Sequence, residues 1–376
     1  MTRLKHALLW LGSALSTPIG LIALWGLFVF IFVSLLVIRN VISQDYNIFL
    51  NASRNLILRD PASPLYQPDN GFYNPVWVAG LIAPVGIVPD RELAFQLWRA
   101  VQIAVLFGAG LLWLRRLPLS QRLLWAALGV VYFPAWESVE FGQVVCFMAL
   151  GYALLYRSST GGSAWLLAPA VLLLTAKPNL AAVALAALSL HLLIARSYRR
   201  LAVLVGTPIA AAAIFLVWYP GWIADWLTSL RETPPGLFHE QTNFYQLAYT
   251  AGGPTLALLV GAPLFLACVS LALLVLRRGG SLRFAVPTLA ALGLLASPQV
   301  AYAYDLTLLL PTFWSLAEER PTRGLALLFF LFPIAIGPIG DDPWAIVITV
   351  LAIGLLIVAQ RLPNPFSLEG EGQAPS

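Results

Sequence analysis

The sequence predicts an all-α polytopic membrane protein, and three observations support that fold class. The 376 residues are 60% hydrophobic and only 10% charged, whereas soluble proteins carry about 25% charged residues. The mean hydropathy is +0.82. Apolar runs of membrane-spanning length recur from one end of the chain to the other. Residues 1–361 are therefore expected to form a single integral membrane domain.

Twelve apolar segments are predicted to cross the membrane. A straight helix needs about 20 residues to do so, and several segments are shorter, which suits a thinned bilayer or a place beside a water-filled cavity. No small-residue cleavage site follows the first run, so we expect it to be retained. The predicted spans are 18–38, 92–114, 121–136, 142–156, 163–176, 178–195, 201–219, 254–276, 284–297, 302–317, 324–339 and 343–360.

The basic residues set the predicted orientation. With the N-terminus inside and the short apolar run 76–88 only half-inserted, 15 of the 22 basic residues fall in inner loops, as the positive-inside rule requires. A crossing at 76–88 would turn the later arginine pairs outward. We therefore expect both termini to be cytoplasmic, in a plasma (inner) membrane, and the Gly/Pro/Glu-rich tail 362–376 to be disordered.

The acidic residues gather on the other side of the membrane. Thirteen of the 17 fall outside in this topology, although acids contribute little to membrane insertion. This excess predicts that the polar chemistry takes place on the periplasmic or extracellular face. Two large outer loops, 39–91 and 220–253, are available to build a site there.

Several other classes of protein are disfavoured. Cys146 and Cys268 lie in apolar runs and are expected to be buried small hydrophobes rather than a disulfide. No Cys/His cluster has metal-ligand spacing, so we expect neither a metal nor a cofactor. The net charge of +5 comes from the inner loops, so nucleic acid is not an expected partner.

The first outer loop begins with a candidate general base, Asp45. Helical spacing predicts an interfacial helix after it, lying on the membrane surface. Spacing alone favours Asp45 as the N-cap of that helix. The alternative is a base that takes a proton from a hydroxyl while a lipid-bound group lies beside it. The apolar face of the helix consists of Tyr46, Phe49, Leu50, Ser53 and Ile57.

Three charged residues near outer helix ends also have two interpretations each. Lys177 either snorkels to the interface or binds an anion, and its apolar outer setting favours the anion. Arg99 lies about 10–12 Å inside its span, where pairing with Glu92 is favoured over contact with a phosphate. Asp305 enters a span from outside, either as a cavity acid or as an N-cap.

The second outer loop interleaves amides and aromatic rings around His239. Such a surface suits a carbohydrate, because rings stack on sugar C–H faces while amides bind hydroxyls. It is equally typical of an aromatic belt at the membrane edge. Both interpretations stay open on the sequence.

The order of seven short motifs resembles glycosyltransferase family 87. These are membrane enzymes of the GT-C fold that use polyprenyl-phosphate sugars, and they include mannosyltransferases of lipoglycan synthesis. No single motif is strong, but each lies at a predicted outer helix end. The motifs are Asp45-Tyr46, Leu65-Tyr66, Tyr73-Asn74-Pro75, Phe141-Gly142-Gln143-Val144, Ala176-Lys177-Pro178, Ser297-Pro298 and Tyr304-Asp305-Leu306.

The resemblance implies transfer of a hexose, such as mannose, from a polyprenyl-phosphate sugar to a lipid or glycan acceptor, with inversion. Asp45 would be the catalytic base, and Lys177 and Arg99 would bind the donor phosphate. The chain departs from the family where many members carry a His near the Ser-Pro motif. The implied cavity residues are Tyr46, Tyr66, Tyr73, Asn74, Gln143, His239, Gln299, Tyr304 and Asp305.

A secondary transporter or lipid flippase is the main alternative, since twelve spans suit it as well. Transporters more often show internal repeats and ionisable residues deep within several spans. Here the candidate polar residues lie at outer helix ends, which favours an enzyme. A non-catalytic membrane scaffold is a third possibility.

Overall fold

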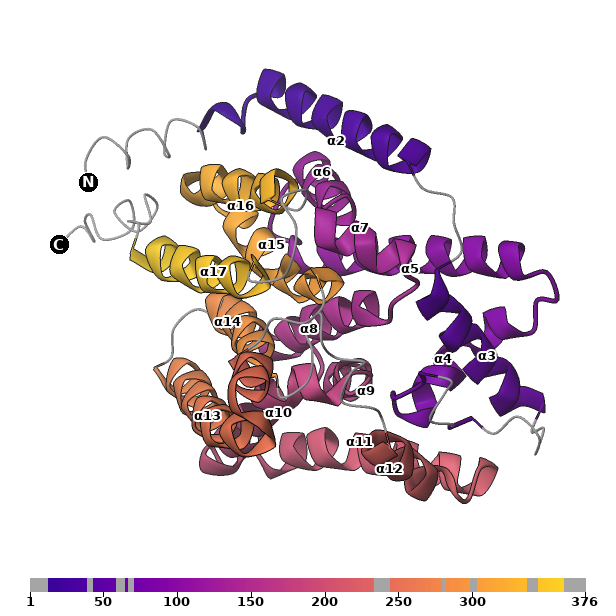
Figure 1. Ribbon diagram of the computed structural model, residues 1–376. Helices are drawn as coiled ribbons and strands as arrows, with labels where there is room; N and C mark the ends of the chain where they lie inside the picture. The colour runs from indigo at the N-terminus through magenta and orange to yellow at the C-terminus, as the bar shows by residue number, and fades with distance from the viewer. Residues whose placement is uncertain are drawn as a thin grey trace.

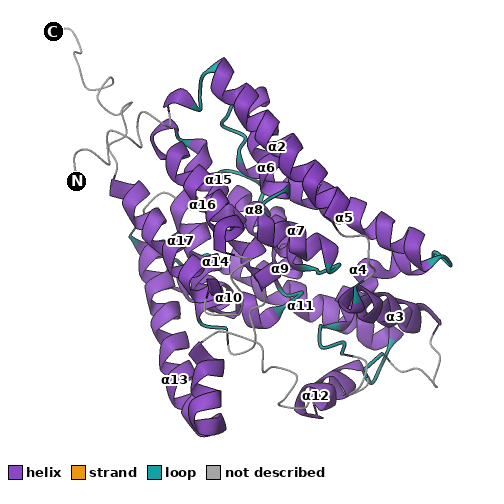
Figure 2. Ribbon diagram, turned by 45° about the horizontal axis from the view of Figure 1, so that its top comes forward, coloured by secondary structure: helices purple, strands orange, loops and turns teal. Residues whose placement is uncertain are grey.

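The computed structural model is entirely helical over the residues that it describes, and no strand occurs among them (Figure 1). Figure 2 shows the described residues as helices and connecting loops, with none drawn as a strand. The predicted all-α class is therefore confirmed. The described residues are 13–38, 43–58, 65–66, 71–232, 244–278, 282–297, 303–336 and 344–361.

Most helices coincide with the apolar runs predicted as spans. Their ends differ from the predicted ones by a few residues, as expected when hydropathy alone sets the boundary. The corresponding helices are α2 (Pro18–Ile38), α5 (Arg91–Trp113), α8 (Val145–Ser159), α10 (Pro178–Ile194), α11 (Tyr198–Trp218), α14 (Leu282–Leu295), α16 (Arg323–Ile336) and α17 (Trp344–Arg361).

Four predicted spans are interrupted or extended. The run 121–136 divides into α6 (Leu119–Val130) and α7 (Phe133–Glu140), because Pro134 fits the first turn of a helix and not its interior. The run 254–276 belongs to a longer helix, α13 (Phe244–Arg277), with non-helical backbone at Gly252 and Gly253. Short 3₁₀ helices precede the other two: η1 (Ala164–Leu166) before α9 (Leu167–Leu174), and η3 (Ala303–Leu309) before α15 (Leu310–Glu318).

The first outer loop forms the two helices expected of it. These are α3 (Gln44–Leu58) and α4 (Val76–Gly86), and they pack against each other. The guanidinium of Arg54 donates to the carbonyl oxygens of Gly86 and Val88 at 3.1 and 2.7 Å. Since the last carbonyls of a helix lack partners within it, Arg54 fastens α3 to the end of α4.

The long apolar helices make the protein a membrane protein. Among the residues that the structure describes, three segments are long and apolar enough to cross a bilayer: Arg91–Trp113, Tyr198–Trp218 and Ala251–Arg277. Several other described helices are apolar but shorter. Helix α11 exposes large apolar side chains, and Val217 is 86% exposed. Lipid contact accounts for such surfaces, which soluble proteins rarely carry as contiguous patches.

Packing brings the two halves of the chain together around α8. This helix packs against α5, α9, α14 and η3 (Figure 1). The hydroxyl of Thr307 in η3 donates to the carbonyl of Pro134 in α7 at 3.0 Å, within buried surroundings. Residues near 45, 143, 177 and 305 are thereby collected in one region of the fold.

Candidate functional site

Ser43, and not Asp45, caps helix α3. The Ser43 hydroxyl accepts a hydrogen bond from the backbone N–H of Tyr46 at 3.1 Å and donates to the carbonyl of Phe141 at 2.9 Å. An N-cap oxygen bonds the third helical N–H in this way. The cap interpretation of Asp45 is therefore replaced, and its carboxylate is not needed to satisfy the start of the helix.

Asp45 instead faces Gln143. The side-chain amide of Gln143 donates to Asp45 Oδ2 at 2.7 Å, and no other hydrogen bond to this carboxylate is present among the described residues. Burial raises the pKa of Asp45, while the Gln143 hydrogen bond and the charge of Lys177 offset part of that rise. The result is a more basic carboxylate than one in open water.

A left-handed turn at Gly142 positions Gln143. Gly142 has φ +68°, and a Cβ atom there would lie 2.8 Å from Tyr46 Cβ. The indole N–H of Trp98 donates to the Gly142 carbonyl at 2.8 Å. Only glycine combines this backbone conformation with so close an approach, so the motif residue has a direct role in joining α3 to α8.

Gln102 supports the same turn and was not identified from the sequence. Its buried amide donates to the carbonyl of Gln143 at 2.5 Å. Gln102 lies one helical turn after Trp98 on α5, so both side chains face the turn. The sequence did contain a signal for Gln102, because a polar amide within an apolar span normally faces protein and not lipid.

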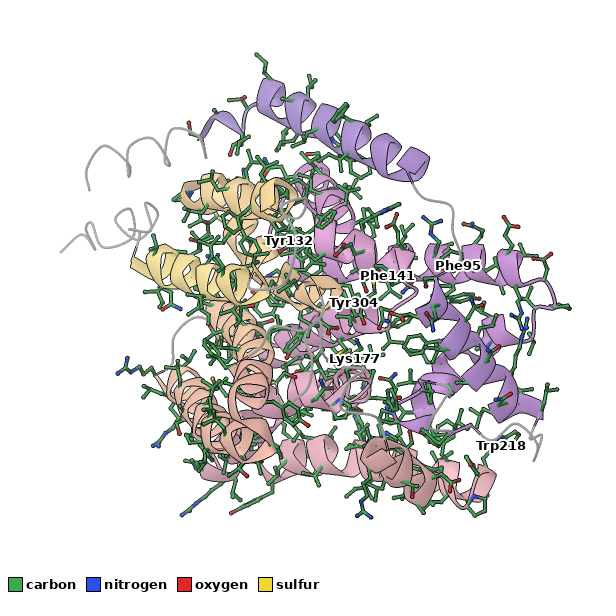
Figure 3. All side chains as sticks on the ribbon, in the orientation of Figure 1. Phe95, Tyr132, Phe141, Lys177, Trp218 and Tyr304 are labelled. Atoms are coloured by element: carbon green, nitrogen blue, oxygen red, sulfur yellow. The ribbon has the colours of Figure 1, made fainter. Side chains whose placement is uncertain are left out.

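Lys177 and Asp305 form an ion pair, with 2.9 Å between Nζ and Oδ1. The side chain of Asp305 is 1% exposed and that of Lys177 is 13% exposed. The ammonium lies 4.8 Å from the centroid of the Tyr304 ring, and that ring lies 5.8 Å from the ring of Phe141. Figure 3 shows Phe141, Tyr304 and Lys177 close together near the middle of the molecule.

This ion pair revises two expectations from the sequence. Lys177 does not snorkel away from the protein, since its charge meets a buried carboxylate. Asp305 is a buried acid paired with Lys177 rather than simply the cap of a span. Because the charge of Lys177 also acts on Asp45, the pair belongs to the same electrostatic environment as the candidate base.

Arg99 packs against two aromatic rings. Its guanidinium carbon is 5.5 Å from the ring centroid of Phe95 and 5.7 Å from that of Trp136. Glu140 accepts a hydrogen bond from the Trp136 indole at 3.0 Å, and its charge acts on Arg99. The expected pairing of Arg99 with Glu92 is not found among the described residues.

The tyrosines of the first outer loop have different surroundings. Tyr46 is buried, with its ring 4.7 Å from that of Phe95, and burial raises its pKa to about 12. The Tyr66 hydroxyl donates to the carbonyl of Asn74 at 2.9 Å, and the Trp226 indole donates to the carbonyl of Tyr73 at 2.8 Å.

The Trp226 contact fastens the first outer loop to α12 (Trp222–Glu232), whereas the Tyr66 contact lies within that loop. Both contacts contribute to packing of the outer loops, and the place of Tyr66, Tyr73 and Asn74 in a substrate cavity stays a prediction. Two further predicted cavity residues, His239 and Gln299, lie outside the described residues, as do the disordered tail predicted at 362–376 and the apolar start of the chain before residue 13.

Comparison with known proteins gives one result. The model of glycosyltransferase family 87 matches residues 72–298, which is more than half of the chain. The matched segment includes Gln143 and Lys177 and ends before Asp305. No curated protein and no solved structure matches the chain.

Proposed function

Because the chain belongs to glycosyltransferase family 87, we propose that it moves a hexose, such as mannose, from a polyprenyl-phosphate sugar to a lipid or glycan acceptor. The reaction would take place on the outer face of the plasma membrane. The family makes the protein a glycosyltransferase, and its apolar helices make it a membrane protein. Both facts favour transfer over the transporter or flippase alternative.

The hydrogen bond from Gln143 to Asp45 is the observation that carries the proposal. It fixes one carboxylate oxygen at the start of α3, while Ser43 provides the helix cap. The other oxygen, Oδ1, accepts no hydrogen bond among the described residues and is available to an acceptor hydroxyl. A half-buried carboxylate with a raised pKa accepts that proton more readily than an exposed one.

The proposed reaction is a single displacement. Asp45 takes the proton of the acceptor hydroxyl as its oxygen bonds to the anomeric carbon of the donor sugar. The bond from that carbon to the phosphate oxygen breaks, and polyprenyl phosphate leaves with the electron pair. Attack opposite the leaving group inverts the anomeric centre.

Lys177 is the proposed partner of the departing phosphate. An ammonium has three N–H donors, and the pair with Asp305 uses one of them. The remaining donors are suited to the charge that develops on the phosphate oxygens, because a fixed cation stabilises such charge best in a site that excludes water. Arg99 is the proposed second cation, held by the rings of Phe95 and Trp136.

The same proposal includes a GT-C-like arrangement of about twelve spans with both termini in the cytoplasm. The agreement between most helix bounds and the predicted spans supports it. The excess of arginines in the loops predicted to be cytoplasmic supports the orientation.

A transfer assay with purified protein tests the function. A labelled sugar on a synthetic polyprenyl phosphate is supplied with extracted lipid and glycan acceptors. The variants are Asp45→Asn and the matched control Asp90→Asn, because Asp90 is an exposed acid in the same outer loop. Asp90 caps α5 by accepting from the N–H of Leu93 at 2.8 Å, and asparagine caps equally well.

We expect wild type and Asp90→Asn to give equal product. Asp45→Asn should be slower by roughly 10²–10⁴-fold, the usual contribution of general base catalysis. Full activity of Asp45→Asn would exclude Asp45 as the base and leave the enzyme class intact. If wild type gave no product from any polyprenyl-phosphate sugar, the donor class itself would be wrong.

A further inference from the structure

A groove of about 690 Å³ runs along α5 toward its inner end. Val101, which lines the groove, directly precedes Gln102, but the groove follows a different face of α5 from the one that carries Gln102. Val101, Val105, Gly108 and Leu112 line it on successive turns, and Leu150 of α8 lines the opposite side. Its described lining is apolar except at one end. None of the residues assigned to sugar transfer is among them.

The length of the groove matches one lipid chain. From residue 101 to residue 112 the helix rises by about 17 Å, close to half of a hydrocarbon core of about 30 Å. Gly108 lies on the floor, where an added Cβ would meet no atom within 4 Å. An apolar groove of this kind in a membrane protein is filled by lipid, since water has no partners there.

Three arginines from different elements close the inner end: Arg115 after α5, Arg122 in α6 and Arg157 in α8. The charge of Arg115 acts on Arg157. Three like charges therefore lie close together, with no acid among the described lining residues. The neighbouring acid Glu318 does not line the groove: it is 3.8 Å from Arg283, and the charges of Arg115 and Arg116 act on it at longer range.

Two of these guanidinium groups have donors without acceptors. Arg122 Nε and Arg157 Nη1 are buried and make no hydrogen bond among the described residues. Arg115 makes one long contact, from Nη2 to the carbonyl of Thr160 at 3.4 Å. Leaving a buried charged donor unsatisfied is costly, and phosphate oxygens are the acceptors that guanidinium groups match best.

We propose that the groove binds an anionic phospholipid of the inner leaflet, with its phosphate against Arg115, Arg122 and Arg157 and one acyl chain along α5. Basic clusters between transmembrane helices on the cytoplasmic side recognise anionic headgroups by this charge complementarity. A zwitterionic lipid would bring its own cation toward three arginines and would bind less well. The inference is independent of the sugar-transfer proposal.

Native mass spectrometry of the purified full-length protein tests the site. Phosphatidylglycerol and phosphatidylcholine with identical chains are titrated separately, and bound lipid is counted. One variant replaces the three groove arginines, R115Q/R122Q/R157Q. Its matched control, R196Q/R199Q/R200Q, removes three exposed arginines, one before α11 and two in its first turn, also on the predicted inner side.

A second pair of variants tests the groove itself. Gly108→Leu places a branched side chain in it, at a position where an added Cβ meets no atom within 4 Å. Gly206→Leu in α11 is the control, because that glycine is also helical and also has no neighbour within 4 Å of an added Cβ. Both replacements improve helix propensity, so neither is expected to unfold the protein.

We expect wild type and both controls to bind phosphatidylglycerol more tightly than phosphatidylcholine, and Gly108→Leu to weaken both lipids. At roughly a factor of five per arginine, R115Q/R122Q/R157Q should weaken phosphatidylglycerol by about 100-fold. Equal loss in R196Q/R199Q/R200Q, or unchanged binding in Gly108→Leu, would overturn the site. If glycerol 3-phosphate, which lacks acyl chains, displaced phosphatidylglycerol as effectively as the lipid itself does, the site would bind free anions. That result would overturn the lipid assignment.

Discussion

Gly142→Ala tests the geometry that joins the candidate base to its hydrogen-bond donor. Gly142 has φ +68°, and an added Cβ would lie 2.8 Å from Tyr46 Cβ and 3.3 Å from its Cα. Both neighbours are held rigidly, because Tyr46 is buried in α3 and its ring packs on Phe95. The turn and α3 must therefore move apart.

The expected loss of stability has two separate causes. A left-handed conformation costs a non-glycine residue about 1–2 kcal/mol, and overpacking in a rigid setting costs about 1–3 kcal/mol more. Movement of the turn also stretches the 2.7 Å hydrogen bond from Gln143 to Asp45 and the 2.9 Å hydrogen bond from Ser43 to Phe141. We expect about 2–5 kcal/mol of lost stability and at least a tenfold loss of sugar transfer.

Gly161→Ala is the matched control. Gly161 has φ +90°, but an added Cβ there would meet nothing within 4 Å. It should therefore show only the backbone cost and retain transfer activity. Thermal unfolding in detergent and kcat/KM for transfer are measured for both variants. Gly142→Ala with the same stability and activity as Gly161→Ala would refute the reasoning that contact with Tyr46 requires glycine.

Three further predictions concern charge. Asp45→Asn should not lower the thermal midpoint, because the raised pKa of Asp45 means that burial disfavours the ionised form; a clear loss of stability would contradict this. As a base, Asp45 must be ionised, so kcat/KM should fall as the pH drops through its raised pKa. Gln143→Ala removes a bond that lowers this pKa and should move the acid limb to higher pH; an unmoved or lower limb would argue against Asp45. Lys177→Met removes the cation that pairs with the buried Asp305 carboxylate and should cost about 3–5 kcal/mol. Adding Asp305→Asn should restore stability but not transfer, and failure to restore stability would show that the pair is not the cause.

The order of the helices and the approximate ends of most of them could be predicted because they depend on neighbouring residues. Hydropathy identified the runs that became α2, α5, α11 and α14, and helical spacing after Asp45 identified α3. The motif order led to the family that the comparison then matched. These signals are local along the chain, so folding does not change them.

The helix breaks were predicted less well for a related reason. The apolar run 121–136 was predicted as one span, although Pro134 marks the start of α7. Hydropathy does not mark such a break, because the run is apolar on both sides of it and proline is favoured in the first turn of the new helix. The sequence also did not show which residue caps α3, since both Ser43 and Asp45 are residue types that cap helices.

What the sequence determined by itself was a helical membrane glycosyltransferase with a carboxylate at the start of its first outer helix. Only the tertiary structure decided how that carboxylate is used. Gln143 reaches Asp45 across 98 residues, and Lys177 reaches Asp305 across 128. Such pairs depend on how α3, α8, α10 and η3 pack, and each polar group takes the partner that burial leaves within reach. No local pattern contains that information, because it arises when apolar faces distant in the chain are buried together.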